Sequence, residues 1–172
     1  MAGQFQIYTG DGKGKTTAAL GLALRAAGAG LKVYFGQFIK TPATSEAVAL
    51  RDRFADSITH VVYGPARFVR STPSENELTE GRHGLDALRA ALTGGRYQVV
   101  IGDEAIAAVA ARLLTEADLL ALAEARPKDV ELVLTGRGAS EALKARADLV
   151  TEMRAVKHYF NQGVQARRGI EF

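Results

Sequence analysis

The residues best suited to chemistry form a glycine-rich segment at positions 9–17, which reads TGDGKGKTT. Glycine occupies alternate positions, so the backbone can turn until several N–H groups point into one concavity. A helix that starts directly after such a loop adds the partial positive charge of its N-terminus. Lys15 can reach terminal phosphates, and the Thr16 hydroxyl can bind Mg²⁺. The segment therefore predicts a phosphate-binding P-loop.

One position departs from the usual pattern G-x-x-x-x-G-K-[ST]. Thr9 stands where the first glycine is expected, and Gly10 comes one residue late. The Gly-Lys-Thr core remains, with a strand pattern before it and a helix pattern after it. A dinucleotide-binding G-x-G-x-x-G loop is excluded, because Lys15 stands where the third glycine would be. The alternative is a glycine-rich turn with chance lysines, which does not account for the matching context on both sides.

Two carboxylates, Asp103 and Glu104, follow the apolar run VVIG. A strand that ends in acidic residues is typical of a Walker B element, in which one carboxylate holds Mg²⁺ or its water shell. Taken alone, the pair favours a solvated strand end over a metal site. Beside a P-loop it predicts magnesium binding together with Thr16, and the spacing leaves open which carboxylate contacts the metal.

ATP is the expected nucleotide. The motif N-K-x-D that reads guanine requires Asn before Lys, and neither Asn76 nor Asn161 is followed by Lys.

Two further segments carry cationic residues. Arg137 stands between two glycines after the expected strand 130–135, where its guanidinium can reach an anion or project into solvent from a turn. The segment 152–160 is dense in basic and aromatic residues, including Lys157 and His158. Taken alone, it is a surface tail or a dimer contact.

These side chains must be positioned by the elements around them. Near-continuous apolar runs favour parallel strands covered on both faces. The expected strands are 5–9, 32–38, 60–63, 98–103, 130–135 and 149–152. Strands alternating with helices predict an α/β fold with a mostly parallel sheet, of the RecA-like P-loop class. Ligands of such sheets bind at the carboxyl ends of the strands, where the P-loop and the acidic pair would meet.

Helix patterns separate these strands. The first covers 15–27, with Leu20, Leu24 and Ala27 on its expected apolar side. A capping box at Ser74 begins the second, which ends at Gly94. Two internal glycines, Gly81 and Gly84, weaken the prediction of this helix. The remaining expected helices are 116–125, capped by Thr115, and a short one to residue 147, capped by Ser140.

Composition sets the outer limits. The 172 residues are the size of one domain, 1–172, and the absence of Cys excludes disulfides, zinc–thiolate sites and thiol catalysis. The net charge of +3 is too small to argue for nucleic acid. There is no apolar run of the roughly 18 residues that a membrane helix needs, and no signal-peptide pattern. We therefore expect a cytoplasmic protein with neither a nucleic-acid nor a membrane partner.

The sequence resembles the corrinoid adenosyltransferases of the CobA/CobO/BtuR family over most of its length. The similar segments are 8–19, 21–26, 37–40, 125–127, 134–139, 147–154, 156–158, 160, 163–164 and 169–172. The P-loop of that family begins at the position of Gly10, which accounts for the shortened spacing. The nucleotide- and corrinoid-binding residues that the resemblance implies are Thr9, Gly10, Asp11, Gly12, Lys13, Gly14, Lys15, Thr16, Thr17, Phe68, Lys157 and His158.

The resemblance implies a reaction in which the Co(I) of a reduced corrinoid attacks C5′ of the ATP ribose and releases triphosphate. The reduced cobalt is the nucleophile, so no protein base is required. The protein would orient the reactants and stabilise the leaving triphosphate, with Lys13, Lys15 and Arg137 as catalytic cations. Magnesium would be held by Thr16, Asp103 and Glu104. The family also implies a homodimer and a flavoprotein reductase as partner.

The departures from the family lie in its corrinoid half. In the stretch 67–70, Phe68 matches a family aromatic, whereas Arg70 replaces a Trp that helps to remove the lower ligand from cobalt. Thr41 stands where Gly is usual, and the stretch after Glu104 lacks a polar residue. Two alternatives therefore stay open: a diverged P-loop ATP-binding protein or ATPase without corrinoid activity, and a nucleotide-binding regulatory or assembly module.

Overall fold

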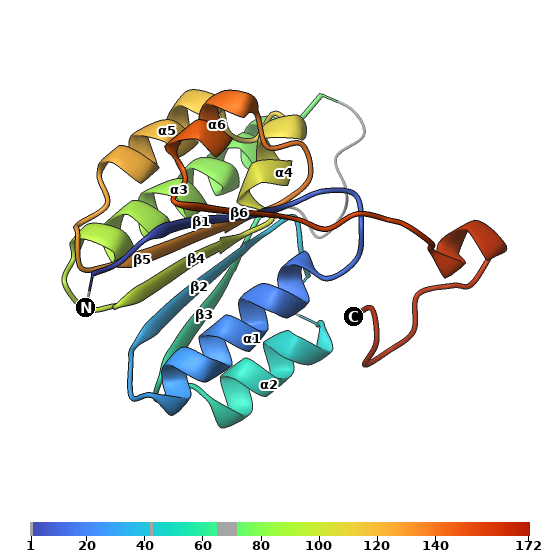
Figure 1. The fold of residues 1–172 in the computed structure, drawn as a ribbon, viewed down its shortest axis with the longest axis horizontal. Helices are drawn as coiled ribbons and strands as arrows, with labels where there is room; N and C mark the ends of the chain where they lie inside the picture. Colours follow the sequence, from blue (N-terminus) through green and yellow to red (C-terminus); the bar gives the residue numbers. More distant parts are fainter. Residues whose placement is uncertain (1, 42, 65–71) are drawn as a thin grey trace.

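A computed structural model describes residues 2–41, 43–64 and 72–172. Its described strands form one six-stranded sheet in the order β3-β2-β4-β5-β1-β6, and every pairing is parallel. Figure 1 shows helices covering both faces of this sheet. The predicted α/β fold with a parallel sheet is thus confirmed. The strands are β1 (Phe5–Thr9), β2 (Val33–Phe38), β3 (Ile58–Tyr63), β4 (Val99–Asp103), β5 (Glu131–Thr135) and β6 (Leu149–Glu152).

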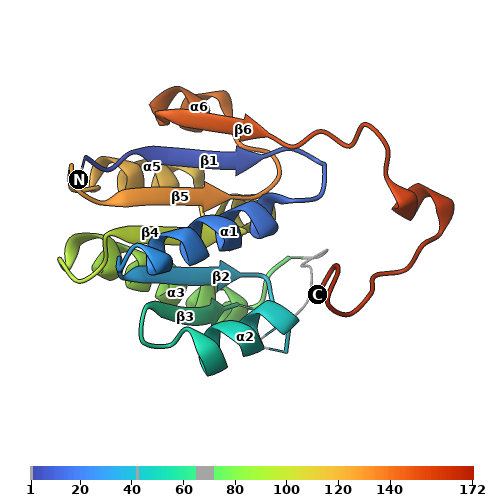
Figure 2. The same cartoon turned by 60° about the horizontal axis from the view of Figure 1, so that its bottom comes forward.

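The helices are divided between the two faces. In Figures 1 and 2, α1 and α2 lie on one face, and α3 to α6 lie on the other. A short 3₁₀ helix, η1, lies beyond the sheet. The helices are α1 (Lys15–Gly28), α2 (Ser45–Arg53), α3 (Glu75–Thr93), α4 (Ala105–Ala110), α5 (Glu116–Glu124), α6 (Glu141–Arg146) and η1 (Tyr159–Gln162). Among the described residues, no helix is long and apolar enough to cross a membrane.

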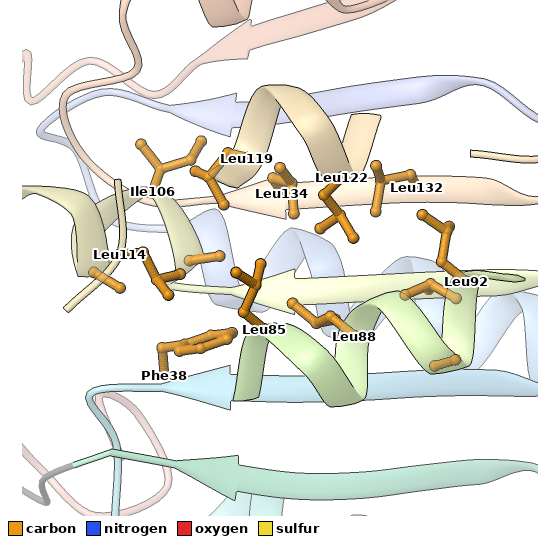
Figure 3. Close-up of a cluster of buried hydrophobic side chains, with 14 of the residues drawn as sticks. Phe38, Leu85, Leu88, Leu92, Ile106, Leu114, Leu119, Leu122, Leu132 and Leu134 are labelled. Carbon is orange, nitrogen blue, oxygen red and sulfur yellow. The ribbon is translucent and has the colours of Figure 1, made fainter. Parts of the chain in front are cut away.

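The larger core cluster lies under α3, α4 and α5. Leu88 and Leu92 of α3 meet Leu122 of α5 and Leu132 of β5, all fully buried (Figure 3). Burying a side chain of this size contributes about 1.5–3 kcal/mol relative to leaving it exposed. This layer holds the central strands in place, so their carboxyl ends can carry the site.

On the opposite face, α1 packs through alanines. Of the expected apolar side, Leu20 and Ala27 pack against the core, whereas Leu24 is 52% exposed. Ala19 and Ala23, which the sequence analysis did not name, are fully buried. These alanines contact the cluster that contains Phe35 and Ile101 of the sheet. Small side chains allow a helix to lie close to the strands, and this helix begins at the P-loop.

The capping box expected at Ser74 is present, with the Ser74 hydroxyl accepting from Glu77 N and the Glu77 carboxylate accepting from Ser74 N. Gly84 of α3 lies where the helix contacts the sheet, and Gly81 lies where it contacts Leu113, between α4 and α5. A Cβ on Gly84 would meet the rings of Phe38 at 2.7 Å and Tyr63 at 2.8 Å. The helix is present despite its two glycines, and their lack of a side chain lets it approach these neighbours closely.

Most strand bounds agree with the sequence. β1 and β6 have the expected bounds, β2, β4 and β5 begin one residue later, and β3 begins two residues earlier. The expectation that β6 is covered on both faces is wrong, because all four of its residues are exposed and it pairs only with β1 among the described strands. The sequence did not predict α2, α4 or η1.

Candidate functional site

A cavity of about 500 Å³ lies at the carboxyl ends of the strands. This is the edge at which parallel α/β sheets bind ligands. The cavity is lined by the loop between β1 and α1, by residues that follow β2, β4 and β5, by the start of α2 and by the end of the chain. The lining positions are 12–17, 20, 40, 45–46, 104, 137, 158 and 169–172.

The P-loop is shaped by the segment that follows β6. Gly12 N donates to the Met153 carbonyl at 2.7 Å, and Met153 N donates to the Thr9 carbonyl at 2.8 Å. A Cβ on Gly10 or on Gly12 would lie within 2.5 Å and 2.7 Å, respectively, of the Met153 carbonyl oxygen. Gly10 also has φ +95°, which side chains disfavour. The two glycines are therefore required by the passing chain as well as by any bound phosphate.

Lys15 is buried inside the loop it follows. Its ammonium donates to the carbonyls of Gly10 at 2.7 Å and Gly12 at 2.8 Å. Burial lowers the pKa of Lys15 from its ordinary value. Both hydrogen-bond partners are neutral carbonyls, so Lys15 lines the cavity without a directly bonded carboxylate.

Asp103 is fully buried, and both of its carboxylate oxygens are occupied. Oδ1 accepts from the Thr135 hydroxyl at 2.7 Å. Oδ2 accepts from the Thr16 hydroxyl at 3.1 Å and from Gln37 Nε2 at 3.0 Å, and the Gln37 carbonyl in turn meets His60 Nε2 at 2.7 Å. Asp103 does not line the cavity. It connects β2, β4, β5 and the P-loop, and it orients the Thr16 hydroxyl.

Of the two adjacent carboxylates Asp103 and Glu104, Glu104 is the one that lines the cavity. Its backbone is left-handed, with φ +58°, and its N–H donates to the Thr135 hydroxyl at 2.9 Å. Burial and the charge of Asp103 raise the pKa of Glu104. The left-handed turn thus directs the two neighbouring carboxylates to different places, one into the sheet and one to the cavity.

The donor set at this wall suits Mg²⁺. The Thr16 hydroxyl and the Glu104 carboxylate are hard oxygen donors on one cavity, and Mg²⁺ usually takes one or two protein oxygens plus phosphate and water. In the described parts of the chain, no group of three or more His, Cys, Asp or Glu residues is arranged to hold a metal alone. The residues therefore fit a metal that arrives with a phosphate.

Lys13 points to the end of the chain. Its ammonium is 3.0 Å from the Glu171 carboxylate and donates to the Tyr159 hydroxyl at 3.1 Å. Glu171 also accepts from Arg167 and Tyr159, and these hydrogen bonds lower the pKa of its carboxyl far below the usual range. Ser45 at the start of α2 donates to the Phe172 carbonyl at 3.0 Å. Figures 1 and 2 show this segment leaving the sheet after β6 and returning beside the site.

A family model described as "ATP:corrinoid adenosyltransferase BtuR/CobO/CobP" matches residues 1–172. The chain belongs to this family. A corrinoid adenosyltransferase of Pseudomonas aeruginosa is 33% identical over 170 residues, covering 99% of this chain and 84% of that protein. A corrinoid adenosyltransferase of Escherichia coli (strain K12) is 33% identical over 167 residues, covering 96% and 84%. The corrinoid adenosyltransferase CobA of Salmonella typhimurium is 33% identical over 171 residues, with the same two coverages.

The family resemblance drawn from the sequence is thus confirmed, and with it membership of a transferase family. The structure brings together at the cavity most of the residues that this resemblance implies. These are Gly12, Lys13, Gly14, Lys15, Thr16, Thr17, Glu104, Arg137 and His158. It places Thr9, Gly10, Asp11, Asp103 and Lys157 outside the lining. Phe68 and Arg70 lie outside the described residues.

Sequence reasoning missed Lys40, Glu46 and the end of the chain as cavity residues. Lys40 follows β2 at the carboxyl edge of the sheet, and that position was a signal available from the sequence. Glu46 lies in α2, which was not predicted. The approach of residues 169–172 depends on the path of the chain beyond the sheet, which no periodicity reports.

Proposed function

We propose that this member of the adenosyltransferase family transfers the 5′-deoxyadenosyl group of ATP to the Co(I) of a corrinoid. The electron pair of Co(I) forms the cobalt–carbon bond at C5′, and the C5′–oxygen bond breaks with its pair on the departing triphosphate. The observation that carries the proposal is the cluster of P-loop cations and Glu104 on one cavity in a chain matched by the family model from end to end.

The proposed work of the protein is to hold the triphosphate and offset the charge that develops on it. Lys15 would exchange its two carbonyl partners for phosphate oxygens, and the loop N–H groups would point at the same anion. Arg137 and Lys13 line the cavity and would add positive charge. Preorganised charges of this kind cost little reorganisation when the bond breaks.

In this proposal Mg²⁺ is held by Thr16 and Glu104, and it supplies further neutralisation of the triphosphate. Asp103 does not bind the metal directly in this proposal, because its carboxylate already accepts hydrogen bonds from Thr16, Gln37 and Thr135. It orients the Thr16 hydroxyl, which binds the metal. Glu104→Gln is therefore expected to weaken Mg²⁺ binding, measured by calorimetry with inorganic triphosphate present. Unchanged Mg²⁺ affinity would refute the assignment.

The corrinoid side of the proposal rests on the family. His158 lines the cavity from the segment before η1, whereas Lys157 is exposed and does not. A homodimer and a flavoprotein reductase follow from the family resemblance and belong to the same proposal. The cytoplasmic location, expected from the sequence pattern, is proposed with them.

The test is adenosylation of chemically reduced cobalamin with ATP and Mg²⁺ under anaerobic conditions. The expected products are light-sensitive adenosylcobalamin, seen by its absorbance, and one equivalent of triphosphate. Turnover should vanish without ATP. Absence of the cobalt–carbon product under strongly reducing conditions would refute the proposal.

A second candidate is ATP hydrolysis without a corrinoid. The raised pKa of Glu104 at the cavity wall favours it, because a half-buried carboxylate there can take a proton from water. Release of inorganic phosphate from ATP in the absence of cobalamin, lost in Glu104→Gln, would support this candidate over adenosyl transfer.

A further inference from the structure

Lys40 reaches the cavity from a strained backbone. It follows Ile39, which has φ +53° although it is β-branched. Such residues rarely adopt a left-handed conformation, and the strain persists only where the surroundings enforce it, often at ligand sites. Here Ile39 N donates to the Tyr63 carbonyl at 3.2 Å, and its side chain packs on the main core. This hydrogen bond and this packing hold the backbone turn at Ile39 in place, and Lys40 follows directly after it.

The turn brings the Lys40 ammonium to the P-loop. Its Nζ lies 3.4 Å from the Thr16 hydroxyl oxygen and 3.8 Å from the Glu46 carboxylate, and the side chain is 22% exposed. The charge of Lys40 partly offsets the rise in the pKa of Glu104, and its effect is larger than that of Lys15. Lys40 thus adds positive charge to the site from the segment after β2, whereas Lys13 lies in the loop after β1 and Lys15 begins α1.

Of the three lysines that line the cavity, Lys40 has the weakest partners. Lys13 is bonded to Glu171 and Tyr159, and Lys15 donates two short hydrogen bonds to carbonyls. The contacts of Lys40, in contrast, are longer than a good hydrogen bond. An anion that enters the cavity can therefore engage the Lys40 ammonium at little cost in existing bonds.

We propose that Lys40 is an additional polyphosphate-binding residue of this site and that the left-handed backbone at Ile39 aims it into the cavity. The ligand is the triphosphate group, bound as part of ATP and held as the leaving group. The inference rests on the proposed function only for the identity of that leaving group. Any polyphosphate in the P-loop would meet the same ammonium.

The test uses inorganic triphosphate as the probe and the full chain, measured by titration calorimetry. Lys40→Met keeps the length of the side chain and removes its charge. It is expected to weaken triphosphate binding about 10-fold, because one charge-assisted contact is lost. Lys40→Arg is expected to recover most of the affinity. Adenosine binding should be the same in all three proteins.

Lys32→Met is the matched control. Lys32 directly precedes β2 at the opposite end of the strand, where its ammonium donates to the Asp56 carbonyl. Its loss should leave triphosphate binding unchanged. Equal affinity of Lys40→Met and the parent chain would overturn the proposal, as would equal weakening by Lys40→Met and Lys32→Met. If the parent chain binds triphosphate but does not adenosylate cobalamin, the proposed function fails while this inference stands.

The role of Ile39 has its own test. Ile39→Pro fixes φ at about −65° and therefore removes the left-handed turn while Lys40 stays in place. Ile39→Gly keeps the left-handed conformation accessible without strain and is the matched control. Triphosphate binding is expected to weaken several-fold in Ile39→Pro and to stay near the parent value in Ile39→Gly, and a thermal unfolding scan reports any general loss of stability. Affinity of a folded Ile39→Pro variant equal to that of the parent chain would show that the left-handed turn does not aim the lysine.

Discussion

The two carboxylates that end β4 have different environments, although they are adjacent in sequence. Asp103 is buried with three hydrogen-bond donors, and Glu104 is turned to the cavity by a left-handed residue. The sequence predicted that both carboxylates lie at the site, but it could not predict which of them faces the cavity. Their separation depends on Gln37 and Thr135, which come from neighbouring strands and have no spacing relation to Asp103.

Thr135→Val tests the structural role assigned to Asp103. The substitution removes the donor to Oδ1 and also leaves Glu104 N without its acceptor. A buried group left unsatisfied costs about 1–3 kcal/mol, and more for a charged one. We expect the free energy of unfolding in urea to fall by at least about 2 kcal/mol. Thr93→Val, at the exposed end of α3, should change it by less than about 0.5 kcal/mol.

Lys15→Ala tests the role proposed for the buried P-loop lysine. Loss of its charge-assisted phosphate contacts is expected to weaken ATP binding about 100-fold. The fold should persist, because the carbonyls of Gly10 and Gly12 can then bond to water from the cavity. Equilibrium dialysis with labelled ATP measures the affinity, and circular dichroism checks the fold. Lys144→Ala on α6 is the control, and ATP affinity equal to its own would contradict the role of Lys15.

At the scale of elements, the sequence predicted those with strong local signals. β1 and β6 have the predicted bounds, and α3 and α5 begin at their predicted caps, Ser74 and Thr115. α2 was missed because only Ala47 and Leu50 of its nine residues are buried, which leaves little apolar periodicity. α4 was missed because AIAAVA directly after β4 reads as more of an apolar run. Tertiary packing decides such segments, and single-sequence patterns do not contain it.

The glycines of α3 lead to a prediction about how this helix packs. Gly→Ala in a helix usually stabilises by roughly 0.5–1 kcal/mol. At Gly84 the new Cβ would meet Phe38 and Tyr63 inside 3 Å, so Gly84→Ala should instead destabilise by about 1–3 kcal/mol. Gly21 of α1 has nothing within 4 Å of a built Cβ, so Gly21→Ala should stabilise. Urea unfolding of the pair gives the comparison, and a stabilising Gly84→Ala would contradict the close approach of α3.

At the scale of the whole molecule, the chain closes on itself around the cavity. Residues near both ends of the chain meet there, since Lys13 follows β1 and Glu171 is the second-last residue. Taken alone, the segment 152–160 predicted a surface tail or a dimer contact, and the family resemblance implied Lys157 and His158 as binding residues. The structure places His158 at the cavity. The sequence did not predict the contact of Glu171 with Lys13, which joins residues 158 positions apart. A spacing rule cannot report a contact of that range.

Glu171→Gln tests whether this carboxylate holds the end of the chain against the P-loop. The parent carboxylate bonds with Lys13, Tyr159 and Arg167, and its pKa is lowered chiefly by Arg167. A neutral amide keeps the shape and loses the charge. Trypsin is therefore expected to cut after Arg167 several-fold faster in the variant, measured by mass spectrometry of the released peptide.

The control and the pH dependence make this prediction specific. Glu141→Gln removes an exposed carboxylate that pairs only with Lys144 among the contacts described, and it should leave the cleavage rate unchanged. A lowered pKa means that the contribution of Glu171 is fully present above the ordinary glutamate pKa and is lost as pH falls through the lowered one. The backbone N–H of Arg167 donates to the Glu171 carboxylate at 2.8 Å, so its hydrogen exchange reports on this contact. After correction for the intrinsic rate, this amide should stay protected from exchange from about pH 8 to pH 5 in the parent chain. Loss of protection within that range, or equal cleavage of both variants, would show that the end of the chain is held by other contacts.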